Sequence, residues 1–376
     1  MLNLPPLSLY LHIPWCVKKC YYCDFNSHVQ KNEVPYQEYI NHLLMDLNHD
    51  ISLISDRTIN TLFIGGGTPS LFSANLIKLL LDGIRQRVPL APDAEITIEA
   101  NPSTIDVDHF AGYKLAGINR ISIGIQSFSA EKLVHLGRIH SAKEARRAVQ
   151  LTASLGLCSF NIDLMQGLPD QSITDSLSDL SEAIALSPPH LSWYQLTIEK
   201  NTLFESRPPV LPDDDILWEI YQHGDILLKA SGYHQYEISS YSRIGFECRH
   251  NLNYWRFGDY LGIGCGAHGK LTQPNGIILR TIKAHHPRNY MQSNYLIKSY
   301  PVVPAELPFE YFMNRFRLLE AVPRAEFSAF TGLKENTVRL ALDHALASNY
   351  ITESINHWQV TQKGKLFLNT LLELFV

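Results

Sequence analysis

The sequence predicts an α/β chain, in which an open partial (β/α)6 barrel is followed by a C-terminal extension and a small winged-helix-like α+β domain. From about residue 7 to 200, short β-rich runs alternate with longer helical patterns, a rhythm typical of a parallel sheet with right-handed crossovers. Six such units fall short of the eight that close a barrel, so we expect an open one. Beyond about residue 205 the rhythm breaks, and the end of the chain carries helices followed by two short β-like segments.

Each predicted element follows from its own pattern of residues. Strands are short runs rich in β-branched and aromatic residues, and helices repeat apolar residues every three or four positions. The predicted strands are 8–13 with its flank, 61–67, 95–100, 120–127, 158–167 and 190–199. The predicted helices are 34–54, 76–88, 104–116 (stopped by Gly117), 141–156 and 173–186 in the barrel, then 308–320, 324–330 and 335–348 near the C-terminus.

These elements divide the chain into three predicted regions. Residues 1–205 form the partial barrel, which is expected to hold the functional site at the carboxyl ends of its strands. Residues 206–300 are expected to be a connecting region, which contains the segment HNLNYW. Residues 301–376 are expected to be the winged-helix-like domain, with a role as a lid or partner surface.

Composition and charge exclude several classes of protein. A hydrophobic fraction of 45% supplies a sizeable core, so a disordered, collagen-like or coiled-coil chain is excluded. The 32 Lys and Arg against 37 Asp and Glu give a net charge of −5, so we expect no nucleic-acid partner. The sequence contains no uncharged apolar run of about 18 residues, so we expect no membrane span. The start of the chain lacks the features of a secretory signal. We therefore expect a cytoplasmic protein, whose six cysteines are not needed for disulfides.

Three cysteines are grouped directly after the first strand. Cys16, Cys20 and Cys23 have the spacing C-x₃-C-x₂-C, which directs several thiols to one centre. Thiolates suit iron–sulfur clusters and zinc. A four-iron cluster held by three thiolates keeps one iron open for a small molecule. Zinc remains an alternative, because His12 and His28 flank the loop and could complete a set of four ligands.

The cysteine loop, with the aromatic Tyr22 before its last cysteine, resembles that of the radical S-adenosylmethionine (radical SAM) superfamily. The resemblance implies that Cys16, Cys20 and Cys23 bind a [4Fe–4S] cluster and that S-adenosylmethionine (SAM) chelates the open iron. The cluster would then pass an electron to the sulfonium and form a 5′-deoxyadenosyl radical. Polar and glycine residues at the ends of the later strands extend the resemblance. The residues that it places around SAM are Tyr10, Tyr22, Gly66, Gly67, Thr68, Glu99, Gln126, Arg138 and Asp163.

Within the superfamily, the chain resembles the group that contains the oxygen-independent coproporphyrinogen III oxidases and the HemW heme chaperones. The oxidase branch carries a fourth cysteine at the position of Phe25 and a long arm before the first strand, and this sequence has neither. The segment HNLNYW at 250–255 resembles a HemW signature. The resemblance therefore argues against a coproporphyrinogen III oxidase. It does not decide whether the chain is an enzyme, and a radical SAM enzyme acting on a porphyrin-like substrate is the alternative.

A HemW-like function implies that the chain binds heme and delivers it to heme-requiring respiratory proteins, after receiving it from a heme donor. His250 is the candidate heme ligand, and Tyr254 and Trp255 could stack on a macrocycle. The alternative is that His250 is a histidine packed in a turn. The sequence does not decide whether the chain contacts a membrane surface transiently or forms a homodimer. The cysteines outside the loop are expected to be buried packing residues: Cys158, Cys248 and Cys265.

Overall fold

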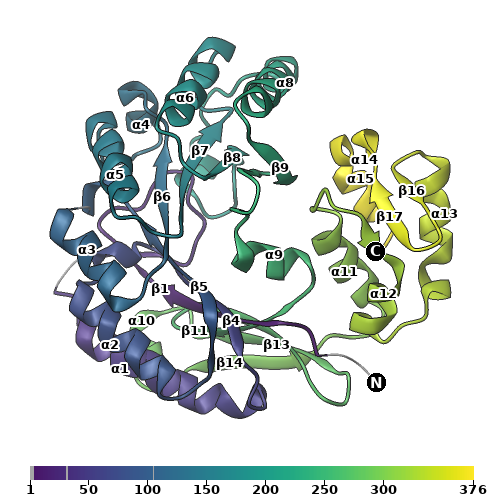
Figure 1. Cartoon of the computed structure of the whole chain (residues 1–376), viewed down its shortest axis with the longest axis horizontal. Helices are drawn as coiled ribbons and strands as arrows, with labels where there is room; N and C mark the ends of the chain where they lie inside the picture. Colours follow the sequence, from purple (N-terminus) through teal and green to yellow (C-terminus); the bar gives the residue numbers. More distant parts are fainter. Residues whose placement is uncertain (1–3, 31–32, 105) are drawn as a thin grey trace.

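The computed structural model describes residues 4–30, 33–104 and 106–376 (Figure 1). Within these residues, a single curved sheet of twelve strands forms the body of the molecule. Its centre is the predicted run of six parallel strands. They are β1 (Leu7–Ile13), β4 (Ile59–Gly66), β5 (Leu90–Ala100), β6 (Arg120–Gln126), β7 (Ser159–Gln166) and β8 (His190–Gln195). The strand order is linear from β14 to β9, so the barrel is open, as predicted.

Helices cover the outer face of the parallel strands (Figure 1). The predicted ones are α1 (Tyr36–Asp50), α2 (Ala74–Arg85), α3 (Val107–Ala116), α5 (Ala142–Ser154) and α6 (Ile173–Ala185). A capping box of Ser141 and Glu144 starts α5, and Gly117 ends α3 with a left-handed φ of 109°, the role predicted for it. Because α4 (Ala130–His135) has only six residues, it offered too little periodicity to be predicted.

Residues 206–300 extend the sheet at both of its edges. A hairpin of β9 (His234–Glu237) and β10 (Ser240–Ser242) pairs with β8, after the helices α7 (Leu203–Ser206) and α8 (Asp214–Ala230). At the other edge, β11 (Asp259–Ile263) runs parallel to β1. The antiparallel strands β12 (His268–Thr272), β13 (Ile278–Lys283) and β14 (Leu296–Pro301) follow it, with α10 (Pro287–Tyr290) before β14. Between the two edges, α9 (Arg249–Trp255) lies inside the curve of the sheet (Figure 1).

The C-terminal part contains the three predicted helices followed by the two predicted β-like segments, together with one short strand and two final helices that were not predicted. Its elements are α11 (Leu307–Arg315), β15 (Val322–Pro323), α12 (Arg324–Thr331), α13 (Arg339–Ala347), β16 (Ile351–Glu353), β17 (His357–Val360), α14 (Gln362–Leu366) and α15 (Leu368–Glu373). A separate core forms around Phe312, Phe327 and Trp358, and the unit lies to one side of the sheet (Figure 1). In the ranges that the structure describes, no helix is both long and apolar enough to cross a membrane.

A buried ion cluster fixes the added strands to the barrel. Lys283 of β13 is fully buried and pairs with Asp46 and Asp50 of α1. Asp46 also accepts hydrogen bonds from the backbone N–H of Gly264 at 3.0 Å and from the hydroxyl of Tyr290 at 2.7 Å. A buried charge persists only where it is paired and hydrogen-bonded. The turn between β11 and β12 is therefore held firmly in place.

Candidate functional site

The carboxyl ends of the parallel strands open into a cavity of about 820 Å³, which is also lined by the cysteine loop. This is where open parallel sheets place their ligands. Eleven of the thirteen residues predicted for the site line this cavity: Cys16, Cys20, Cys23, Tyr22, Gly66, Gly67, Thr68, Glu99, Gln126, Arg138 and Asp163. The other two, Tyr10 and His250, line an adjoining cavity of about 240 Å³, which also contains Glu99 and Asp163.

The cysteine loop lies between β1 and α1 and includes the short strand β2 (Trp15–Cys16), which pairs with β3 (His28–Val29). Cys16 is buried, and Cys20 and Cys23 are partly buried. Burial raises the pKa of the Cys16 and Cys23 thiols, so a metal that binds there must displace their protons. Among the described residues, no three His, Cys, Asp or Glu side chains form a ready-made metal site. The motif and the shared cavity, rather than sulfur-to-sulfur distances, are the support for a cluster here.

The glycine turn after β4 is tied to the cysteine loop by backbone hydrogen bonds. The N–H of Gly67 donates to the carbonyl of Ile13 at 2.6 Å, and that of Thr68 donates to the carbonyl of Trp15 at 2.8 Å. A Cβ at Gly67 would lie 2.5 Å from the Trp15 oxygen, and Gly66 has a φ of 111°. Only glycine fits both positions, and the backbone here can approach a ligand closely.

Two buried carboxylates lie at the ends of β5 and β7. Glu99 accepts a hydrogen bond from the N–H of Gly66 at 3.1 Å. Burial, together with the charge of Asp163, raises the pKa of Glu99 to about 8. Burial also raises the pKa of Asp163, although Asn161 and Ser122 donate hydrogen bonds to it at 2.7 and 3.1 Å. A cationic ligand with hydroxyl groups would relieve this cost, and SAM has an ammonium, a sulfonium and a ribose.

Polar groups on β6 and the following loop complete the wall. Gln126 ends β6 with a left-handed φ of 73° and accepts a hydrogen bond from the hydroxyl of Tyr194 at 2.7 Å. Arg138 donates to the carbonyl of Gly124, and its other terminal nitrogen lies 3.5 Å from the Sγ of Cys20. Sequence reasoning missed Tyr194. It lies in the middle of the predicted strand 190–199, and only the structure shows that the strand ends at Gln195, next to this residue.

Tyr10 and His12 extend the site along β1. The hydroxyl of Tyr10 lies 3.0 Å from Nδ1 of His12, and Nε2 of His12 lies 2.8 Å from the carbonyl of Asn26. Burial lowers the pKa of His12 to about 4, so the ring is neutral. Nε2 of His28 lies 3.1 Å from the carbonyl oxygen of His285. Since both ring nitrogens of His12 are engaged within the protein, the geometry does not favour the zinc alternative.

His250 is buried on α9, and both of its ring nitrogens are engaged. Nδ1 lies 2.8 Å from the hydroxyl of Thr61, and Nε2 lies 2.9 Å from the hydroxyl of Tyr254. Glu95 accepts hydrogen bonds from the backbone N–H groups of Arg249 and His250, so it caps the helix from outside. Burial lowers the pKa of His250 to about 3. These contacts favour the packed-histidine alternative, because a heme iron would have to break one of the two hydrogen bonds.

The other cysteines follow the predictions in part. Cys248 and Cys265 are buried, as predicted. The prediction that Cys158 is a buried packing residue is wrong, because its side chain is exposed. The strand β7 begins one residue later, at Ser159, so Cys158 belongs to the connection on the surface.

An open (β/α)6 sheet with three cysteines at its carboxyl edge defines a radical SAM protein. The family model for the radical SAM superfamily matches residues 10–180, and the model for the HemN C-terminal domain matches residues 302–367. The chain is 63% identical to the heme chaperone HemW of Escherichia coli, over the full length of both proteins. It is 58% identical to the heme chaperone HemW of Haemophilus influenzae, over 100% of this chain and 99% of that protein. The chain therefore belongs to the HemW family. The solved structure of coproporphyrinogen III oxidase (HemN) from Escherichia coli shares the fold, with a TM-score of 0.85 and 23% identity over 99% of this chain and 90% of that one.

Proposed function

We propose that this chain is a heme chaperone that carries a [4Fe–4S] cluster and SAM. The observation that carries the proposal is the single cavity that gathers three cysteines, a glycine turn and two buried carboxylates at the carboxyl ends of the strands. Relatives named heme chaperone HemW, similar over their whole length, supply the heme part of the proposal.

The residues of the large cavity, together with Tyr10 of the adjoining cavity, divide between the two cofactors. Cys16, Cys20 and Cys23 would hold the cluster through their thiolates. When bound, the cluster and SAM together supply one-electron chemistry at the sulfonium. The chain's own part is to hold SAM, and the residues for this are Tyr10, Tyr22, Gly66, Gly67, Thr68, Glu99, Gln126, Arg138 and Asp163.

Heme is the cargo, received from a heme donor and delivered to heme-requiring respiratory proteins in the cytoplasm or at the membrane surface. Phe25 occupies the position at which the oxidase branch carries a fourth cysteine, and this supports a chaperone over a coproporphyrinogen III oxidase. The negative net charge of −5 supports the expectation that nucleic acid is not a partner. A homodimer is compatible with this function.

The test begins with metal analysis of chain purified without oxygen. About four irons and four sulfides per chain are expected, and one zinc in their place would refute the cluster. The reconstituted protein is then reduced and mixed with SAM, with and without coproporphyrinogen III, and 5′-deoxyadenosine is measured. Substrate-dependent turnover would favour the radical enzyme over the chaperone. Hemin-loaded protein should finally transfer its heme to a heme-free respiratory cytochrome, and failure of transfer would remove the delivery step.

A further inference from the structure

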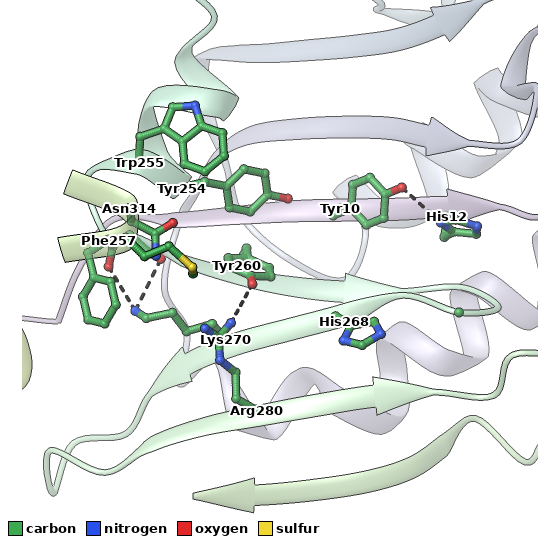
Figure 2. Close-up of a pocket in the computed structure, with 13 residues that line it drawn as sticks. Tyr10, His12, Tyr254, Trp255, Phe257, Tyr260, His268, Lys270, Arg280 and Asn314 are labelled. Carbon is green, nitrogen blue, oxygen red and sulfur yellow. Dashed lines mark hydrogen bonds between the residues drawn. The ribbon is translucent and has the colours of Figure 1, made fainter. Parts of the chain in front are cut away.

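A further cavity of about 380 Å³ is lined by Tyr254 and Trp255 of α9 (Figure 2). Its walls come from β1, α9, the added strands β11–β13 and α11. Aromatic side chains dominate it: Tyr10, Tyr254, Trp255, Phe257 and Tyr260. The rings of Tyr254 and Tyr260 meet edge to face, with their centroids 4.5 Å apart. Such a lining suits a flat, largely apolar ligand.

The charged groups of this cavity are of one sign. Lys270 and Arg280 line it, and no Asp or Glu side chain does so within the described ranges. Lys270 pairs with the buried Asp259 at 3.0 Å. The guanidinium of Arg280 donates to the hydroxyl of Tyr260 at 2.7 Å and to Glu310 at 2.6 Å, and these contacts hold it at the aromatic wall. A planar ring with carboxylate substituents complements this combination of aromatic surface and positive charge.

One histidine of this cavity differs from the others described above. His268 begins β12 and is exposed, and its ring nitrogens make no hydrogen bond to any described residue. Its backbone is well placed, because the preceding turn is anchored by hydrogen bonds from Gly264 to Asp46 and from Gly266 to the carbonyl of Ala284. Partial burial, together with His285 and Arg280, lowers the pKa of His268, so the ring is neutral at pH 7. A neutral imidazole without a partner is a ready iron ligand.

We propose that the cavity bounded by α9 and β11–β13 is the heme seat and that His268 is the protein ligand of the heme iron. The inference rests on the proposed function and gives that function a site. His268, Gly266 and Tyr10 also line a cavity of about 570 Å³ that reaches Lys19 and Phe25 of the cysteine loop. The seat therefore adjoins a cavity that reaches the cysteine loop. Met313 and Asn314 of α11 also line the seat.

The test is a titration of full-length chain, with its cluster reconstituted, with hemin. Optical and electron paramagnetic resonance spectra report the ligand, and the titration gives the dissociation constant. The variant is His268→Ala. The matched control is His223→Ala on α8, another exposed histidine, which lines none of these cavities. A second variant, Met313→Trp, narrows the cavity from α11 and leaves His268 intact.

His268→Ala should lose the spectrum of histidine-ligated iron and weaken hemin binding about tenfold or more, and added imidazole should restore the spectrum. Met313→Trp should weaken binding while the remaining complex keeps the histidine spectrum. His223→Ala should match the unmodified chain. If the unmodified chain binds no hemin, the proposed function itself fails. If it binds hemin and His268→Ala does so equally, with the same spectrum, the heme seat is overturned and the proposed function stands. Equal losses in His268→Ala and His223→Ala would also overturn the seat.

Discussion

Replacing His250 by alanine tests whether this histidine supports α9 or binds heme. The imidazole joins Thr61 of β4 to Tyr254 of α9, and its ring lies 5.1 Å from that of Phe63. Alanine removes both hydrogen bonds and leaves a gap between the helix and the sheet. The structure therefore predicts a loss of stability rather than a loss of iron ligation.

The contacts set the size of the effect. Thr61 keeps its hydrogen bond with Ser8 at 2.7 Å, so losing the contact with His250 costs little at this side chain. The hydroxyl of Tyr254 is left without its partner in a buried place, which costs about 1–3 kcal/mol. The lost ring packing adds about 1–2 kcal/mol. We expect the free energy of unfolding to fall by about 2–4 kcal/mol and the melting temperature by about 3–5 °C.

Thermal melting and a hemin titration below the transition provide the measurements, with His223→Ala as the control. His250→Ala should melt earlier and should still show histidine-ligated iron, although the displaced Tyr254 would weaken binding. A variant that melts like the unmodified chain but has lost the histidine spectrum would refute this reasoning and make His250 the heme ligand.

Three other substitutions have defined outcomes. Because the pKa of Glu99 is raised in the folded protein, this side chain keeps a proton that it releases on unfolding, and the protein therefore loses stability as pH rises from about 4.5 through about 8. Glu99→Gln should remove this loss, which is worth a few kcal/mol above pH 8 in denaturant titrations. The same variant should weaken SAM binding in calorimetry about tenfold or more. Gly67→Ala should displace the glycine turn from the cysteine loop and abolish measurable SAM binding. The control Gly245→Ala has nothing within 4 Å of its added Cβ and should only lower the melting temperature slightly. If Gly67→Ala still bound SAM, the backbone of this turn would not need to approach the ligand closely. Lys283→Met should leave Asp46 buried without its cation and destabilise the chain by about 3–5 kcal/mol in urea unfolding, and a change below 1 kcal/mol would show that the ion cluster is dispensable.

The barrel was predictable because its periodicity is local. The parallel strands are short runs rich in buried apolar residues, and the helices α2, α5 and α6 each have a clear apolar face. The added strands were not predictable in the same way. The strand Ser240–Ser242 has only three residues, and its pairing with β8 is a tertiary contact. The helix α8 was missed although Asp213 supplied a recognisable N-cap before its apolar repeat.

The site shows the same division. Residues at the ends of parallel strands meet at one edge, so Glu99, Gln126 and Asp163 could be grouped from sequence order alone. The surroundings of His250 could not, because its partner Thr61 is 189 residues away and the cap from Glu95 is 155 residues away. The motif marks where the histidine is, and only the packing of α9 against β4 shows what its ring contacts.

The large cavity and the proposed heme seat share one residue of α9, and this decides which substitutions can assign an effect to one cofactor. Trp255 lines both the SAM cavity and the proposed heme seat, so a change there cannot be attributed to either ligand alone. Glu99 lines the SAM cavity but not the proposed heme seat, and His268 lines the seat but not the SAM cavity. Glu99→Gln should therefore lower SAM affinity while the hemin spectrum stays unchanged, and His268→Ala should do the reverse. If both variants altered both ligands alike, the division of the molecule into two sites along α9 would be wrong.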